Sequence, residues 1–210
     1  GKVLVMKVFL TVLVLIFGLH SWTYGDDIRD FEIEGMSVGD SLLDYFPKYL
    51  IDEAINKSSS LYYKNKKYVQ IGASYKKVYK LNITSKTYDD LSIVLKPNDN
   101  SYKIYSIGGR IFCKDIEICK SKKKEISSDL ESFFSDEVQI QNIDKNHNAD
   151  PSGNSKSFTS YFNFKKSDAY ALVAVYDWSN KFEEEKNYPD NLKIVIVGEE
   201  FGHFLNNEQY

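Results

Sequence analysis

The pattern of apolar and polar positions predicts helices that alternate with groups of strands. Residues 31–34 alternate between apolar and polar, as a half-buried strand does. From Ser37 the apolar spacing becomes helical and continues to Phe46. Pro47 interrupts this pattern and is suited to open a second helix over 47–57. The start of the chain therefore predicts a short strand followed by two helices.

Aromatic and β-branched residues dominate the next stretch and favour strands. We expect these strands at 68–71, 77–83, 91–95, 102–107 and, after Gly108 and Gly109, at 110–112. Turn-forming residues at 97–100 lie between two apolar runs, so 91–95 and 102–107 are predicted to form a hairpin.

The second half of the chain repeats this order. A helical apolar stripe predicts the longest helix at 115–135. The polar stretch 142–155 is predicted to be a loop. A second hairpin, a last strand and a short helix are expected at 158–164 with 169–178, at 192–197 and at 199–206.

The short turns between the strands imply antiparallel pairing. We therefore expect an α+β fold, in which helices pack on one face of an antiparallel sheet or sheets. The order of helices and then a meander of strands occurs twice, which suggests two such halves. Residues 26–210 are expected to form a single domain, with a candidate internal boundary within 142–156.

Residues 1–25 have the pattern of a secretory signal peptide. Lys2 and Lys7 precede an apolar core at 8–18, and a more polar stretch leads to the acidic Asp26. An uncleaved membrane anchor is the alternative, although the core is shorter than the ~20 apolar residues of a membrane span. We expect an exported protein, periplasmic or extracellular, without a stable membrane span in its mature chain.

The composition excludes several classes of protein. The 210 residues are 42% hydrophobic and 15% aromatic, which is too apolar for intrinsic disorder. The formal net charge of −3 lacks the basic footprint of a nucleic-acid binder. No phosphate-binding glycine loop, dinucleotide fingerprint, serine-hydrolase motif or zinc-protease motif is present. We therefore expect no cofactor.

Cys113 and Cys119 are predicted to form a disulfide, because two cysteines in an exported chain usually pair. If both were helical, their Cα atoms would lie ~9 Å apart, which is too far for a bridge. The bond therefore requires Cys113 to lie ahead of the helix. Two buried free thiols, or a redox or metal-binding role, remain as alternatives.

Tyr161, Tyr170, Tyr176 and Trp178 are candidate binding residues in the second predicted hairpin. In a strand, every second side chain points to the same side, which places the last three together. One face of the hairpin must pack on the core, and a surplus of aromatic residues on the other would form a recognition surface. Core packing of all these rings is the alternative.

Residues 144–150 carry oxygen-bearing side chains at alternate positions, as a calcium loop does. The four candidate ligands are Asp144, Asn146, Asn148 and Asp150. Ala149 stands where such a loop needs glycine, and Ser155 where it needs a bidentate glutamate. A solvated polar turn is therefore the preferred interpretation, and no bound metal is expected.

Residues 31–46, 150–155, 176–179 and 204–207 resemble uncharacterised secreted proteins encoded in small, AT-rich marine bacterial genomes. This resemblance implies a bacterial, exported protein and no particular activity. Gly35-Met36-Ser37, followed by a helix and the hairpin at 91–107, also resembles the SmpA/OmlA and β-lactamase-inhibitor-like fold. Such proteins are envelope adaptors or inhibitors that bind other proteins through their sheet. The lipid-bearing cysteine of that family is missing here.

Three functional hypotheses follow. The first is a non-enzymatic exported protein that binds a partner protein or envelope component through its sheet. The second is a carboxylate-based hydrolase of cell-wall or glycan material, which would need two carboxylates roughly 5–9 Å apart in a cleft. The third is a small-ligand carrier, which would need a dry cavity walled by aromatic side chains.

Overall fold

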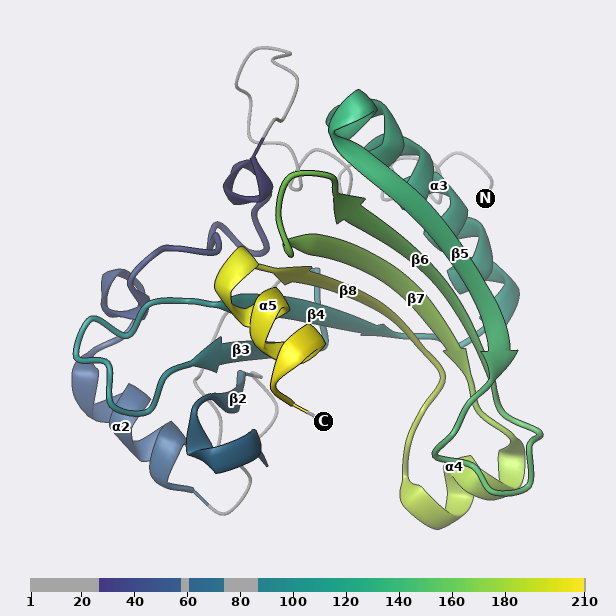
Figure 1. The fold of residues 1–210 in the computed structure, drawn as a ribbon. Coiled ribbons are helices and arrows are strands. Elements are labelled where there is room, and N and C mark those ends of the chain that lie inside the picture. Colours follow the sequence, from purple (N-terminus) through teal and green to yellow (C-terminus); the bar gives the residue numbers. More distant parts are fainter. Residues whose placement is uncertain (1–26, 58–60, 74–86, 210) are drawn as a thin grey trace, which may run out of the picture.

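One antiparallel sheet forms the centre of the protein (Figure 1). The computed structural model describes residues 27–57, 61–73 and 87–209. In these residues the strands lie in the order β1-β2-β3-β4-β8-β7-β6-β5. Their bounds are β1 (Leu61–Tyr62), β2 (Val69–Ala73), β3 (Asp90–Leu95), β4 (Ser106–Phe112), β5 (Val138–Asn146), β6 (Lys156–Phe164), β7 (Tyr170–Asp177) and β8 (Asn191–Val197). Helices pack against this sheet, so the predicted α+β class is confirmed.

The strand order reflects two similar halves of the chain. The helix α2 (Lys48–Asn56) precedes β1 to β4, and α3 (Ile116–Phe134) precedes β5 to β8. The halves join where β4 pairs with β8, in a register that runs from Ser106 opposite Val197 to Phe112 opposite Asn191. The predicted repetition of a helix and a meander is thus present in the fold.

Helices cover the two faces of the sheet unequally. Both α2 and α3 contribute to the main hydrophobic cluster on one face, which we call the core face. The last helix, α5 (Glu199–Asn207), lies on the opposite face, in front of the sheet in Figure 1. We call this opposite face the open face. The short helix α4 (Asn180–Lys186) lies in the connection between β7 and β8.

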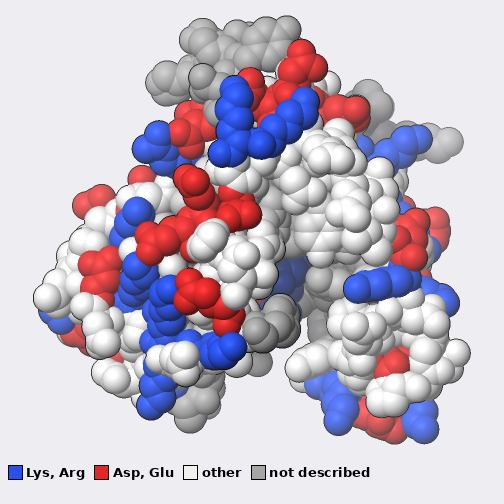
Figure 2. Space-filling model, in the orientation of Figure 1, with Lys and Arg blue, Asp and Glu red and all other residues white. Residues whose placement is uncertain are grey.

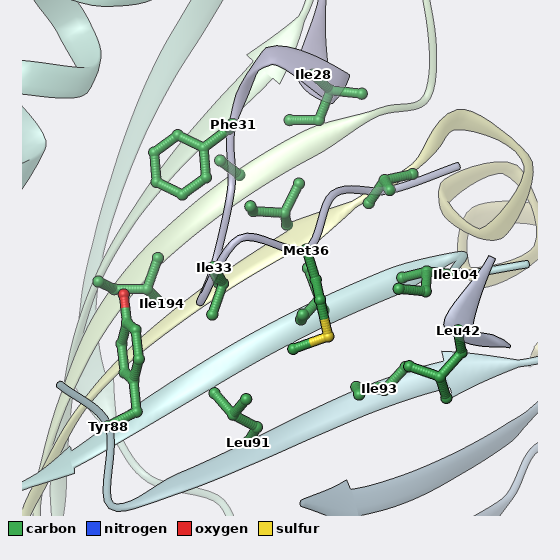
Figure 3. Packing of buried hydrophobic residues seen from close by; sticks show 14 of the residues in the cluster. Ile28, Phe31, Ile33, Met36, Leu42, Tyr88, Leu91, Ile93, Ile104 and Ile194 are labelled. Carbon is green, nitrogen blue, oxygen red and sulfur yellow. The ribbon is translucent and has the colours of Figure 1, made fainter. Parts of the chain in front are cut away.

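The irregular segment 28–46 completes the core face. Phe31, Ile33 and Met36 are almost fully buried, and they pack with the apolar side chains of β3 (Figure 3). Burial alternates along 31–34 as predicted, but these residues do not form a strand. The chain instead turns at Glu34 and Gly35, both of which have positive φ.

The α-helix predicted over 37–46 is wrong. Only the 3-10 turn η2 (Leu42–Asp44) is helical there, because the backbone bonds to a neighbouring segment instead of to itself. The N–H of Gly39 donates to Ile104 O at 2.9 Å, and that of Leu42 donates to Tyr102 O at 3.0 Å. Gly39 has a φ of +100°, a backbone conformation that a helix cannot contain.

Gly108 and Gly109 lie inside β4, which continues through both to Phe112. The predicted strand at 102–107 therefore begins later, at Ser106, and its predicted break is absent. A Cβ atom at Gly109 would lie 2.7 Å from Cγ of Tyr88, whose ring is buried against the core face. The small residue is thus required by packing and does not mark a turn.

The predicted loop at 142–155 is wrong in its first part. Residues up to Asn146 belong to β5, which pairs with β6 as far as Asn146 opposite Lys156. This strand lies at the edge of the sheet and most of its side chains are exposed, so it needs no apolar alternation. The remaining residues, 147–155, connect β5 to β6.

The elements with stronger patterns agree with the prediction. These are α2, whose N-cap is Pro47, α3 with its N-cap Asp115, the hairpin of β6 and β7, the strand β8, and α5. The predicted leader at 1–25 and the predicted strand at 77–83 lie outside the described residues. No described helix has the length and apolar character that would let it cross a membrane.

Cys113 and Cys119 form a disulfide, as predicted, with their Cα atoms 6.1 Å apart. Cys113 follows β4 and precedes α3, whereas Cys119 lies within the first turns of α3 and is buried. The bond therefore ties the last strand of the first half to the helix that begins the second.

Replacing both cysteines with serine is expected to lower the free energy of unfolding by about 2 kcal/mol, because the crosslink restricts the unfolded chain across a short loop. Urea denaturation of the wild type and of the Cys113→Ser/Cys119→Ser variant measures the difference. Intact mass after alkylation under denaturing, non-reducing conditions is the control. Uptake of two labels by the wild type would contradict the bond, and equal midpoints would contradict its stabilising role.

Candidate functional site

Three of the four candidate aromatic residues lie on the open face, along β6 and β7. Tyr161 comes from β6, whereas Tyr170 and Tyr176 come from β7. Tyr161 lies opposite Leu172, which shares a face with both β7 tyrosines because strand side chains alternate. The rings of Tyr161 and Tyr170 are 6.0 Å apart. We call Tyr161, Tyr170, Leu172 and Tyr176 the tyrosine patch; all four are partly exposed.

Trp178 lies beyond the end of β7 and belongs to a different group of rings. Its side chain is buried and stacks on Phe182 of α4 with ring centroids 5.0 Å apart. His147 lies 4.3 Å away, measured between ring centroids. The pKa of this histidine is lowered, first by burial and then by Lys145. Trp178 therefore packs α4 against the end of the sheet and is joined to the tyrosine patch through Tyr176.

Two cations extend the open face beyond the tyrosine patch. Lys193 of β8 lies opposite Arg110 of β4 on one side and opposite Ala174 of β7 on the other. In β8 the core-facing residues Leu192, Ile194 and Ile196 are buried, which turns Lys193 to the open face. Figure 2 shows a largely uncharged area over this part of the sheet, hollowed toward its centre, with basic side chains within the hollow.

The sequence carried a signal for Lys193 but none for its neighbour. The alternation of 191–197 places Lys193 on the face opposite the aliphatic residues, so its orientation was predictable. Arg110 was not recognisable as a site residue, because the pair of glycines before it was interpreted as a break. Neither residue was among the predicted site residues, since nothing local indicates that β4 and β8 are neighbours.

The electrostatic environment differs between the two cations. Arg110 forms an ion pair with Asp90 of β3; its side chain is 43% exposed, whereas that of Asp90 is 8% exposed. Lys193 makes no hydrogen bond or ion pair with the described part of the chain. Burial, and then the neighbouring Arg110, lower the pKa of the Lys193 ammonium. Lys193 is thus a partly exposed cation that lacks a counter-charge among the described residues.

Tyr176 shares the environment of these cations. Burial raises the pKa of its hydroxyl, the nearby Tyr161 raises it further, and Arg110 acts in the opposite direction. The hydroxyls of Tyr161 and Tyr176 have no hydrogen-bond partner among the described residues. Within the described residues, both phenol groups therefore keep unused hydrogen-bonding capacity.

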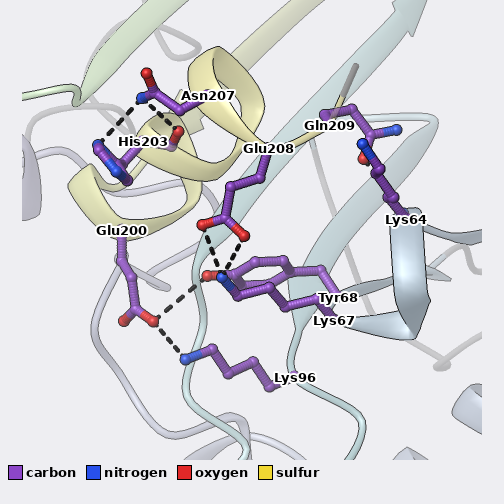
Figure 4. Close-up of polar contacts among 9 residues, drawn as sticks. All are labelled: Lys64, Lys67, Tyr68, Lys96, Glu200, His203, Asn207, Glu208 and Gln209. Atoms are coloured by element: carbon purple, nitrogen blue, oxygen red, sulfur yellow. Dashed lines mark hydrogen bonds and ion pairs between the residues drawn. The ribbon is translucent and has the colours of Figure 1, made fainter.

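The helix α5 forms one border of the site, and Figure 4 shows the polar contacts that attach this helix to the segments around Lys67 and Lys96. Its Phe201 and Phe204 pack on Tyr68 and Val94 in a second hydrophobic cluster, against which Tyr170 and Val195 also pack. Around this cluster, Glu200 pairs with Lys96, and Glu208 pairs with Lys67 at 2.8 Å. The helix therefore covers the part of the open face around Tyr68, Val94 and Val197, and it borders the tyrosine patch at Tyr170.

No protein family, curated protein or solved structure matches this chain. The proposed function therefore rests on the geometry of the open face alone.

The four candidate calcium ligands are divided between β5 and the connection that follows it, which holds Asn148 and Asp150. Asp144 and Asn146 lie in β5, where Asn146 accepts a hydrogen bond from Lys156. The buried Asp150 carboxylate accepts hydrogen bonds from the hydroxyls of Ser155 at 2.6 Å and Ser179 at 2.9 Å, and these bonds lower its pKa. No group of three or more His, Cys, Asp or Glu residues within the described ranges is arranged to hold a metal ion.

A depression of about 500 Å³ lies elsewhere, beside the segment 28–46, and contains two carboxylates, Glu32 and Asp40. The Asp40 carboxylate accepts bonds from the N–H of Ser37 at 2.9 Å and from the hydroxyl of Tyr45 at 2.6 Å. Burial, and then Asp40, raise the pKa of that hydroxyl. Asp40 therefore has a local role in holding this turn, and the polar lining differs from the apolar cavity of a carrier.

Proposed function

We propose that the protein is an exported, non-enzymatic binding module that recognises a partner protein through the open face of its sheet. The observation that carries this proposal is the tyrosine patch beside Arg110 and Lys193, on a sheet whose other face is buried under α2 and α3. The solvent-facing side of an antiparallel sheet is ordinarily polar, so neighbouring tyrosines there call for an explanation.

The chemistry of the patch suits protein recognition. Tyrosine and arginine are enriched where proteins bind each other, because each combines a broad apolar surface with hydrogen-bonding groups. The side chains project from paired strands and partly bury each other: Ala174, between Leu172 and Tyr176 along β7, is fully covered. A surface held in this way loses little conformational entropy when a partner binds.

The disulfide supports the proposal that the protein is exported. Bonds of this kind form and persist in oxidising compartments and are rare in the cytosol. The expected leader at 1–25 points to the same compartment. The partner is therefore sought among exported or envelope proteins.

Tyr161→Ala is expected to weaken partner binding about tenfold or more, because truncation removes a central ring of the patch. The partner is first captured from the envelope fraction of the source cells with a photo-crosslinking amino acid at position 161. Its affinities for purified wild type and variant are then compared by biolayer interferometry.

Tyr49 provides the matched control. It is 68% exposed on α2, away from the patch, so a crosslinker or alanine there makes the same chemical change at an unrelated surface. Crosslinking at 161 but not at 49, together with a loss of affinity only in Tyr161→Ala, is the expected result. Equal crosslinking at both positions, or equal affinity of both alanine variants, would overturn the proposal. Turnover of a cell-wall substrate by the purified protein would favour the hydrolase instead.

A further inference from the structure

A row of side chains crosses the open face from β3 to β6. Successive registers place Asp90 opposite Arg110, Arg110 opposite Lys193, Lys193 opposite Ala174, and Ala174 opposite Thr159. This row contains two cations and one acid. It therefore has an excess of one positive charge at its centre, although the whole chain has a net charge of −3.

The excess charge is unfavourable in the free protein. Like charges directly opposite each other on paired strands repel, and Arg110 and Lys193 are such a pair. Asp90 compensates Arg110 through their ion pair, which leaves Lys193 without a counter-charge among the described residues. Partial burial of a cation without a partner lowers stability, and a negatively charged ligand on this face would offset that cost.

Hydroxyl donors lie in the rows on either side of the row that contains Lys193. Tyr176 is in the adjacent row, opposite Asn191, which is two residues before Lys193 along β8. Tyr161 occupies the row on the other side, opposite Leu172. Both hydroxyls lack a protein partner in the described residues, and Arg110 is close enough to influence the titration of Tyr176. Cationic and neutral donors therefore gather at one place on the open face.

We propose that Lys193, Arg110 and Tyr176 form a carboxylate-binding site that receives an aspartate or glutamate side chain from an acidic segment of the partner protein. This inference rests on the proposed function and names the chemistry of its central contact. A carboxylate accepts charge-assisted hydrogen bonds from an ammonium, a guanidinium and a phenol at once. Its single negative charge matches the single excess positive charge of the row.

The test uses two peptides of glycine and serine, one with three central glutamates and the other with three central glutamines. Each is titrated into ¹⁵N-labelled wild-type protein at low ionic strength, where electrostatic contacts are least screened. We expect the glutamate peptide to shift the amide signals of Arg110 and Lys193 and to bind about tenfold more tightly than the glutamine peptide. Equal binding of the two peptides would overturn the inference.

Lys193→Met removes the charge and keeps the length of the side chain. We expect this variant to lose the tenfold preference for glutamate, and Lys193→Arg to restore most of it. The control is Lys181→Met, which removes one lysine charge from α4 at a side chain that is 82% exposed. A preference that persists in Lys193→Met, or that disappears equally in Lys181→Met, would overturn the site.

The same variants separate this inference from the proposed function. If the crosslinked partner binds Lys193→Met as tightly as wild type and Tyr161→Ala weakly, the carboxylate site is wrong and the binding face stands. If the glutamate preference is present and depends on Lys193 but crosslinking at 161 matches that at 49, the carboxylate site stands. In that case the proposed protein-binding function is wrong.

Discussion

Phe134→Ala is expected to lower the free energy of unfolding by about 3–5 kcal/mol, the usual cost of truncating a buried phenylalanine. Phe134 ends α3 and is 1% exposed. Its ring lies 4.9 Å from that of Phe164 in β6 and 6.5 Å from that of Phe31, measured between centroids. Truncation therefore leaves a cavity where the helix, the sheet and the irregular segment 28–46 meet.

Urea denaturation measures this effect as a lower midpoint with an unchanged slope. Phe112→Ala is the matched control, because Phe112 is 37% exposed at the end of β4 and its truncation opens no cavity in the core. We expect a change of less than about 1 kcal/mol for the control. Similar losses in both variants would contradict the packing that the structure assigns to Phe134.

Gly202→Ala is expected to destabilise the protein by about 1–3 kcal/mol, because overpacking forces neighbouring groups apart. The same substitution inside an ordinary helix stabilises by ~1 kcal/mol, so the sign of the effect is the test. A Cβ atom at Gly202 in α5 would lie 2.8 Å from the carbonyl carbon of Asp168 and closer still to its oxygen. Asp168 lies in the turn between β6 and β7, so α5 would have to move away from the sheet.

Comparing His203→Ala with Gly202→Ala separates the two contributions to stability at this turn, which are a polar contact and close packing of the backbone. His203 Nδ1 lies 2.8 Å from the Asp168 carboxylate, but the histidine side chain is 60% exposed, so losing this contact should cost less than about 1 kcal/mol. Thermal unfolding of the two variants compares these contributions. A more stable Gly202→Ala protein would show that the backbone of α5 does not approach the turn closely.

The elements that could be predicted are those whose determinants are local. The helix α3 has an apolar stripe and an N-cap at Asp115, and the hairpin of β6 and β7 alternates along both strands. Cys113 and Cys119 are close in sequence, so a helix boundary between them is sufficient for their bond. In each case the interacting residues are near neighbours along the chain.

The wrong predictions have one cause in common. In each case the structure depends on contact with a distant segment of the same chain, which the sequence does not identify. Residues 37–46 have a helical spacing, but their backbone groups bond to the segment around Ile104. The edge strand β5 is polar because most of its side chains, on both faces, are exposed to solvent, and it is recognised only through its pairing with β6. Gly109 resembles a break until the ring of Tyr88 is seen against it.

For the candidate site, the sequence was sufficient to place Tyr161, Tyr170 and Tyr176 on the two strands of a hairpin. It was also sufficient to show that Lys193 faces away from the aliphatic side of its strand. Alternation along a strand is a property of the backbone and needs no distant contact. Only the tertiary structure decided which face stays open, that Trp178 packs against Phe182 of α4, and that Arg110 lies beside Lys193. Those outcomes depend on which strands pair and which helix covers them, and such long-range contacts are set by the packing of the whole chain.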